Sequence, residues 1–229
     1  MIVRAIKTPV FKEGQSIAEF VLKHVKKPKE GSVIVVTSKI VALSESRTVP
    51  LVQKDAVIKA ESEFALKTKY AWLTIKDGTV MANAGVDESN ASGKLILLPK
   101  DSFKAAAEIR KALQKKWKLK KLGVLITDSR LMPLRAGVVG VALGYAGFKG
   151  IRDYRGRPDI FGRKLKMSQT DVADSLATAA VLEMGEGREQ RPLAVMSDAS
   201  VEFINKTNTK ELLIPLKEDL YYPLFTNLR

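Results

Sequence analysis

The chain has 229 residues and no cysteine, which excludes disulfides, thiolate metal sites and cysteine nucleophiles. Hydrophobic residues make up 45% of the chain and charged residues 28%, as in globular proteins, and no apolar run reaches the roughly 18 residues of a membrane span. The N-terminus lacks a signal-peptide pattern, so we expect a soluble, cytoplasmic protein. The net charge of +14 indicates an anionic partner, either nucleic acid or a small polyanion.

Hydrophobic periodicity predicts both strands and helices along the chain. The strands are expected near residues 2–7, 32–37, 71–75, 78–83, 122–126 and 192–196, and the helices near 16–27, 56–67, 103–119 and 170–184. Residues 138–150, punctuated by glycine, are typical of a buried strand followed by a tight turn. Because strands and helices mix without strict alternation and no linker interrupts them, we expect an α+β fold of mixed sheets with packed helices.

The single histidine, His24, lies in the first predicted helix, where Ser16 and Glu19 form a capping box. A histidine at such a position belongs to the surface or boundary of its helix, so serine–histidine triads and zinc sites are not expected. Any chemistry must then depend on carboxylates, lysines, arginines and the backbone. A metal would be held by oxygen atoms, which favours magnesium, manganese or calcium.

Three carboxylates are expected where secondary-structure elements end. Asp87 follows a short apolar strand in "ANAGVDESN" (82–90), Asp128 and Ser129 close the apolar run "VLITDS", and Glu186 lies between glycines in "MGEG". Turn chemistry explains each carboxylate when it is taken singly. Together, in a chain rich in cationic side chains, they predict a metal-bound phosphate site.

The densest basic run, "KKWKLKK", closes the segment 102–121, in which Ala106, Ile109, Leu113 and Trp117 form an apolar stripe. A solvated amphipathic helix explains this pattern, and a nucleic-acid-binding helix is the alternative. Aromatic residues are 7% of the chain and are not interleaved with the basic ones, as a base-stacking platform requires. The favoured partner is therefore a small molecule rich in phosphate or carboxylate groups.

The nucleotide fingerprints of other folds are incomplete in this chain. "SGKL" (92–95) lacks the upstream glycine and the Ser/Thr of a P-loop, and "GYAGFKG" is not a dinucleotide-binding fingerprint. A nucleotide site, if present, must be built in another way.

Six segments, taken in order, resemble the coenzyme F-420-0:L-glutamate ligase family. They are "VVTSK" (35–39), "NAGVDESN" (83–90), "ITDS" (126–129), "DYRGRPDIFGRKL" (153–165), "VAD" (172–174) and "MGEG" (184–187). The pattern N-A-G-[VI]-D-x-S-N is the specific one among them. The resemblance implies a gamma-glutamyl ligase-like fold of two closely packed subdomains over residues 1–229, with residues 193–229 unmatched, and a homodimer.

The activity that this resemblance implies is a GTP-dependent ligase. It would activate an acceptor carboxylate as an acyl phosphate and join it to the amine of L-glutamate, in the biosynthesis of coenzyme F-420 or a related cofactor. The implied partners are L-glutamate, an anionic carboxylate acceptor, GTP as co-substrate and Mg²⁺ or Mn²⁺, with no membrane and no nucleic acid. The alternatives are a folate-like or other acceptor, a degenerate nucleotide-binding member, or a basic nucleic-acid-binding protein.

The resemblance also implies roles for particular residues, although it assigns no catalytic residue. Asp87, Asp128, Ser129 and Glu186 fall on the metal ligands. The positions that contact GTP are Thr8, Pro9, Val10, Phe11, Ser38, Lys39, Asn90, Met184, Gly185, Glu186, Gly187, Arg188, Glu189, Gln190 and Arg191.

The chain departs from the family pattern at "ALSESR", where Leu43 replaces a nucleotide-binding lysine and Ser46 replaces a glycine. We expect Lys39, four residues earlier on the same strand-to-loop segment, to lie on the same face and to supply the missing charge. The alternative is a member that has lost GTP use. The stretch 47–70 is also shorter than the family's helical insert, and residues 196–198 differ from the family's terminal motif.

Overall fold

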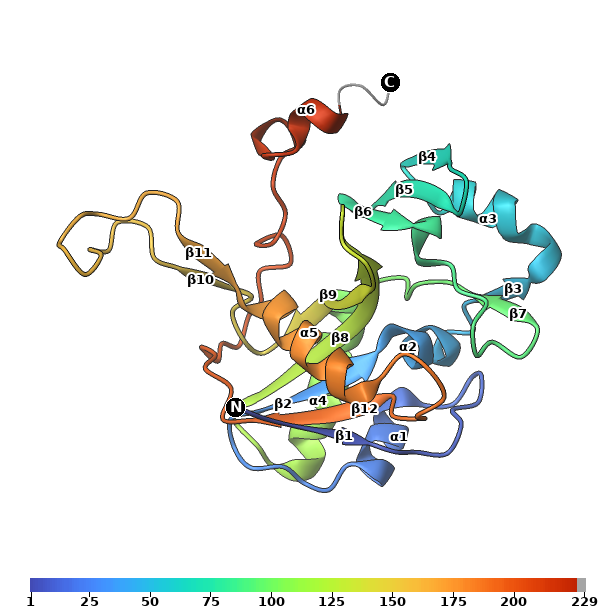
Figure 1. The fold of residues 1–229 in the computed structure, drawn as a ribbon. Helices are drawn as coiled ribbons and strands as arrows, with labels where there is room; N and C mark the ends of the chain where they lie inside the picture. Colours follow the sequence, from blue (N-terminus) through green and yellow to red (C-terminus); the bar gives the residue numbers. More distant parts are fainter. Residues whose placement is uncertain (226–229) are drawn as a thin grey trace.

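A mixed five-stranded sheet lies at the centre of the computed structural model, which describes residues 1–225 (Figure 1). The strand order is β1-β12-β2-β8-β9, and only β2 and β8 are parallel neighbours. The strands are β1 (Ile2–Ile6), β12 (Leu193–Ser197), β2 (Ser32–Thr37), β8 (Leu122–Leu131) and β9 (Val138–Ala146). The result is a mixed α/β structure, as expected at this level from the sequence.

Helices cover both faces of this sheet. The helices are α1 (Ile17–His24), α2 (Ser38–Ser44), α4 (Ser102–Trp117) and α5 (Val172–Met184). Ile34 and Val36 of β2 pack in the cluster that contains α1, α2 and α4, whereas Val33 and Val35 pack in the cluster that contains α5. Since β2 is buried on both faces, its sequence is a continuous apolar run instead of an alternating one.

A smaller lobe is built from residues 48–98 (Figure 1). It contains two small sheets, β3-β7 and β4-β5-β6, and one short helix. The elements are β3 (Thr48–Pro50), η1 (Leu51–Gln53), α3 (Lys54–Ala60), β4 (Phe64–Lys67), β5 (Trp72–Lys76), β6 (Thr79–Ala82), η2 (Asn83–Gly85) and β7 (Lys94–Ile96). Ile58, Val86, Leu95 and Leu97 form its own apolar core.

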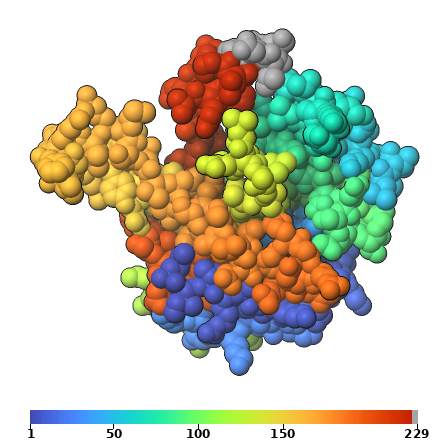
Figure 2. All heavy atoms as spheres, viewed as in Figure 1, coloured from blue at the N-terminus to red at the C-terminus, as the bar shows by residue number. Residues whose placement is uncertain are grey.

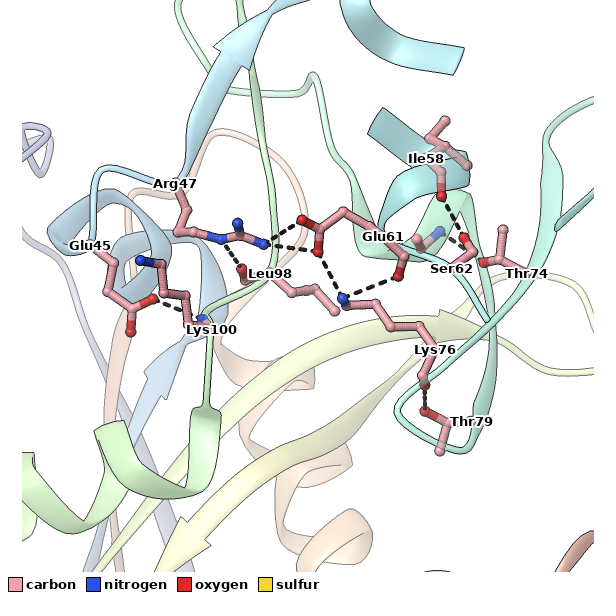
Figure 3. A network of polar contacts seen from close by, with 11 residues as sticks. Glu45, Arg47, Ile58, Glu61, Ser62, Thr74, Lys76, Thr79, Leu98 and Lys100 are labelled. Atoms are coloured by element: carbon pink, nitrogen blue, oxygen red, sulfur yellow. Dashed lines mark hydrogen bonds and ion pairs between the residues drawn. The ribbon is translucent and has the colours of Figure 1, made fainter. Parts of the chain in front are cut away.

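An ionic network fixes this lobe to the segment that follows α2 (Figure 3). Arg47 Nη2 lies 2.8 Å from both carboxylate oxygens of Glu61, and Lys76 Nζ lies 2.8 Å from Glu61 Oε2. Arg47 Nε also donates to the carbonyl of Leu98 at 3.1 Å. Because these side chains are partly buried, the network positions the lobe more firmly than an exposed ion pair does.

Two segments extend beyond the sheet and its helices. The hairpin of β10 (Ile151–Asp153) and β11 (Gln169–Asp171) carries a long loop that projects from the body as an arm (Figures 1 and 2). The chain after β12 runs upward past the base of this arm to η3 (Leu216–Glu218) and α6 (Tyr222–Phe225) (Figure 1). None of the helices in residues 1–225 is long and apolar enough to cross a bilayer.

Most of the elements expected from the sequence are confirmed, including the strand within 138–150 and the buried stripe of α4. The helix expected at 56–67 is wrong in its second half, because α3 ends at Ala60 and residues 64–67 form β4, which pairs with β5. The helix expected from residue 170 begins at Val172, since Gln169–Asp171 pairs with β10.

Candidate active site

A cavity of about 480 Å³ lies where five segments of the chain meet. The segments are the loop after β1, the start of α2, the loop after η2, the middle of β8 and the loop after α5. Each residue that the family resemblance assigned to the metal or to GTP lines this cavity, namely Thr8, Pro9, Val10, Phe11, Ser38, Lys39, Asp87, Asn90, Asp128, Ser129, Met184, Gly185, Glu186, Gly187, Arg188, Glu189, Gln190 and Arg191.

Hydrogen bonds to backbone carbonyls hold the rim of the cavity together. The N–H of Thr8 donates to the carbonyl of Gln190 at 2.9 Å, so the loop after β1 lies against the loop after α5. Asn90 Nδ2 donates to the carbonyl of Gly187 at 3.5 Å, which brings the loop after η2 to the same loop. Segments more than 90 residues apart therefore form one rim.

The backbone conformation of the segment before Asp87 requires glycine at position 85. Gly85 has a φ of +72°, and a Cβ at this position would lie 2.5 Å from a side-chain carbon of Leu98. Asp87 then pairs with Ile96 through two backbone hydrogen bonds, of 2.9 and 2.8 Å. The side chain of Asp87 is thereby placed in the cavity wall.

Asp87 forms an ion pair inside the cavity. Lys39 Nζ lies 2.8 Å from Asp87 Oδ2, and the N–H and Oγ of Ser89 donate to the same carboxylate at 2.7 and 2.9 Å. Burial raises the pKa of Asp87, but the hydrogen bonds from Lys39 and Ser89 outweigh burial and leave the pKa below its usual value. Asp87 is therefore an anion at neutral pH.

The sequence predicted that Asp128 and Ser129 end their strand, and this prediction is wrong. β8 shifts register between Ile126 and Thr127 and then continues to pair with β9 as far as Leu131, so Asp128 lies within β8. Ser38 Oγ donates to Asp128 Oδ1 at 3.2 Å. Burial raises the pKa of Asp128, although the charge of Arg130 and the hydrogen bonds from Ser129 and Ser38 oppose this rise.

Glu186 lies just beyond the end of α5, where the sequence placed it. Gly185 ends the helix with a φ of +82°, and a Cβ there would lie 2.6 Å from the carboxylate carbon of Glu189. Ser129 Oγ donates to both oxygens of Glu186, at 2.8 and 2.9 Å. The two residues expected to share a metal are thus in direct contact with each other.

The four expected ligands suit a hard divalent cation by their chemistry. Asp87, Asp128, Ser129 and Glu186 offer only oxygen donors, as Mg²⁺ and Mn²⁺ prefer, and a cation nearby would offset the burial of Asp128. In the observed side-chain arrangement, residues 1–225 contain no group of three or more acidic, histidine or cysteine side chains that could hold a metal ion. Instead, Lys39 forms an ion pair with Asp87, and Ser129 donates a hydrogen bond to Glu186.

The sequence did not identify Ser89 as a residue of the site, and it did not predict helix α2. Ser89, which contacts both Lys39 and Asp87, was not singled out, although it lies inside the specific motif. Lys39 and Leu43 both line the cavity, but they lie on helix α2 and not on a strand-to-loop segment. Their spacing of four residues still places them on one face, because helical residues at i and i+4 are neighbours.

A family model and several known proteins that are similar to this chain all carry the description of an F420 glutamate ligase. The family model described as F420-0:Gamma-glutamyl ligase matches residues 5–69 and 54–198. The Coenzyme F420:L-glutamate ligase of Methanococcus maripaludis strain C7 is 34% identical over 91% of this chain and 91% of the relative. That of Methanocaldococcus jannaschii is 31% identical over 94% of each chain. The match to strain S2 of M. maripaludis is 44% identical over 64% of this chain, and spans 58% of that relative.

Proposed function

Because the chain belongs to the F420-0:gamma-glutamyl ligase family, we propose that it is a ligase that adds L-glutamate in coenzyme F420 biosynthesis. The observation that supports this proposal most is the gathering of residues 8–11, 38–39, 87, 89–90, 128–129 and 184–191 around one cavity. Such convergence of segments far apart in sequence is what a nucleotide and metal site requires.

The proposed reaction uses GTP to phosphorylate the carboxylate of the acceptor. The amine of L-glutamate then attacks the acyl carbon, phosphate leaves, and an amide bond remains. Asp87, Asp128, Ser129 and Glu186 would hold Mg²⁺ or Mn²⁺, which offsets phosphate charge and aligns the transfer. The remaining work of the chain is to bind and orient its substrates, so no histidine is required.

Within the cavity, cationic side chains suit the phosphates of GTP. Lys39 reaches the wall from α2, and Arg188 and Arg191 lie in the loop after α5. Arg191 Nη1 donates to the carbonyl of Glu183 at 3.3 Å, which leaves its other donors for a ligand. These three side chains are our candidates for phosphate contacts.

We also propose that the protein is a homodimer with the two-subdomain architecture of the family. The projecting arm supports the dimer, because Ile160, Phe161 and Met167 on it are 92%, 88% and 87% exposed. Apolar side chains gathered on a projecting segment mark an interaction surface. Light scattering that gives the mass of one chain at micromolar concentration would refute the dimer.

A thermal-shift and ligation experiment tests the proposed function. GTP should raise the melting temperature only in the presence of Mg²⁺ or Mn²⁺, and the protein should release phosphate from GTP when F420-0 and L-glutamate are both present. If oligonucleotides instead stabilise the protein in a salt-sensitive way and GTP does not, the chain is a nucleic-acid-binding protein.

A further inference from the structure

A second cavity, of about 1040 Å³, lies along β9 at the edge of the main sheet. Its walls come from α4, β9, the turn between β5 and β6, and residues 205–213 of the C-terminal segment. Arg130 lines this cavity, and Arg130 follows Asp128 of the candidate active site by two residues on β8. Because side chains two residues apart point to the same face of a strand, Arg130 of the larger cavity and Asp128 of the candidate active site lie on one face of β8.

The charges around the larger cavity favour an anionic ligand. Seven cationic side chains line it, namely Lys100, Lys104, Arg110, Lys111, Arg130, Lys206 and Lys210, against the four carboxylates Asp77, Asp101, Asp171 and Asp174. The nine ion pairs formed by residues 1–225 involve none of these seven cations. The lining therefore holds more cationic than anionic side chains, and none of these seven cations forms an ion pair within residues 1–225.

Most of the carboxylates in the lining already serve as acceptors of backbone hydrogen bonds. Asp101 accepts from the N–H of Lys104, Asp171 from that of Asp174, and Asp174 from that of Ala142. Arg130, by contrast, has a buried Nε without a hydrogen-bond partner among the described residues. A buried donor of this kind is costly to leave unpaired, and it belongs to an arginine that lines the cavity.

One wall of the cavity is the C-terminal strap, which we define as residues 203–213. Glu211 Oε1 accepts hydrogen bonds from Tyr145 Oη and from the N–H of Gly150, both at 2.7 Å. Two residues further along the strap, Leu213 Cδ2 lies 3.4 Å from the position of a Cβ on Gly78, in the turn of the smaller lobe. The strap thus contacts both the main sheet, through Glu211, and the smaller lobe, through Leu213.

The size of the cavity points to the larger of the two substrates that are joined. Its volume is about twice the 480 Å³ of the candidate active site, and apolar side chains such as Phe103, Leu143 and Leu212 contribute to its lining. A pocket of this kind suits a ligand with an extended apolar body and a few charged groups. Glutamate alone has no such body.

We propose that this cavity binds the anionic carboxylate acceptor of the ligation and that the strap is the wall that selects it. The proposal rests on the proposed function, and it extends that function by giving the acceptor a place. The strap lies beyond residue 198, where the match to the family model ends, but within the 94% of the chain that the relative from Methanocaldococcus jannaschii matches.

The test reverses charge on the strap in the full-length protein. Lys206→Glu combined with Lys210→Glu places two anions in the cavity wall, at exposed positions whose replacement leaves the core intact. Lys115→Glu combined with Lys116→Glu is the matched control, because it changes the net charge equally at exposed positions on α4 outside the cavity. The KM values for F420-0, GTP and L-glutamate are measured for the native protein and for both variants.

The strap variant should raise the KM for F420-0 at least tenfold relative to the control, while the KM for GTP stays within twofold. If the native protein ligates F420-0 and the strap variant matches the control, the acceptor binds elsewhere and the proposal is overturned, while the proposed function stands. If the native protein ligates no glutamate to F420-0, the proposed function fails, and the assignment of the acceptor to this cavity fails with it.

Discussion

Lys39 Nζ lies 2.8 Å from Asp87 Oδ2, so a cation proposed to contact GTP is paired with a carboxylate proposed to hold metal. While they form this ion pair, Lys39 cannot contact a phosphate of GTP and Asp87 cannot hold a divalent cation. We expect a divalent cation to replace Lys39 at Asp87, and the released ammonium group to move to a phosphate. Its long, flexible stem permits this exchange without movement of α2.

The first prediction concerns Lys39 and Leu43, which lie one helical turn apart on α2. Lys39→Ala should weaken GTP binding in the presence of Mn²⁺ by about tenfold to a hundredfold, because a hydrogen bond to a charged group contributes about 1.5 to 3 kcal/mol. Isothermal titration calorimetry measures the change, with Lys39→Arg as the charge-preserving control. Unchanged affinity in Lys39→Ala would show that Lys39 does not supply the missing charge. If Leu43→Lys binds GTP and the native chain does not, the chain is a member that has lost GTP use.

The second prediction separates the role of Asp128 in metal binding from its role in folding. Asp128→Asn should abolish the metal-dependent stabilisation by GTP. It should also keep or increase the free energy of unfolding at pH 7. The folded-state pKa of Asp128 is raised by burial, so its charged form destabilises the fold as pH rises, and an amide removes that cost.

Thermal shifts with and without GTP and Mn²⁺ provide the measurement for Asp128. Glu108→Gln is the matched control, since Glu108 is an exposed carboxylate on α4 outside both cavities. Retention of the full metal-dependent shift in Asp128→Asn would remove Asp128 from the proposed ligands.

The sequence was sufficient to predict elements whose burial pattern is local. The apolar run of β2 and the stripe of α4 identify their elements, because each pattern depends on only one strand or helix. Phe64–Lys67 was assigned to a helix because the segment continues an apolar pattern. Its strand conformation depends on pairing with β5, which local periodicity does not reveal.

In the site, too, the features that depend on local sequence could be predicted, whereas those that depend on tertiary contacts could not. The motif around Asp87 and the glycines beside Glu186 were visible as turn chemistry, and both residues line the cavity as expected. Asp128 was placed at a strand end, because the pairing that carries β8 on to Leu131 comes from β9. The larger cavity could not be predicted, because its walls meet only after the strap crosses from Gly150 to the smaller lobe.

The third prediction concerns the anchor of the strap. Glu211→Ala should lower the free energy of unfolding by about 1 to 3 kcal/mol, because Tyr145 Oη and the N–H of Gly150 would each lose an acceptor. Glu211→Gln keeps an oxygen at the same place and should lose less stability. Urea denaturation of the three proteins makes the comparison. Equal stability of the alanine variant and the native protein would show that Glu211 does not anchor the strap.

The last prediction concerns the dependence of stability on pH through Asp171, which caps α5. Burial raises the pKa of Asp171 to about 6, and the neighbouring charge of Asp174 adds to this rise. Because the folded state then holds a proton more tightly than the unfolded state, this residue makes stability fall as pH rises from about 4 to about 6.

Asp171→Asn should therefore flatten this part of the stability profile and should stabilise the protein at pH 7. Asparagine caps a helix about as well as aspartate does, so the bond from the N–H of Asp174 should survive. Urea denaturation at a series of pH values between 4 and 8 measures the effect, with Asp159→Asn on the exposed arm as the control. If the native protein and Asp171→Asn lose stability in parallel over this range, Asp171 is not the group whose proton links folding to pH.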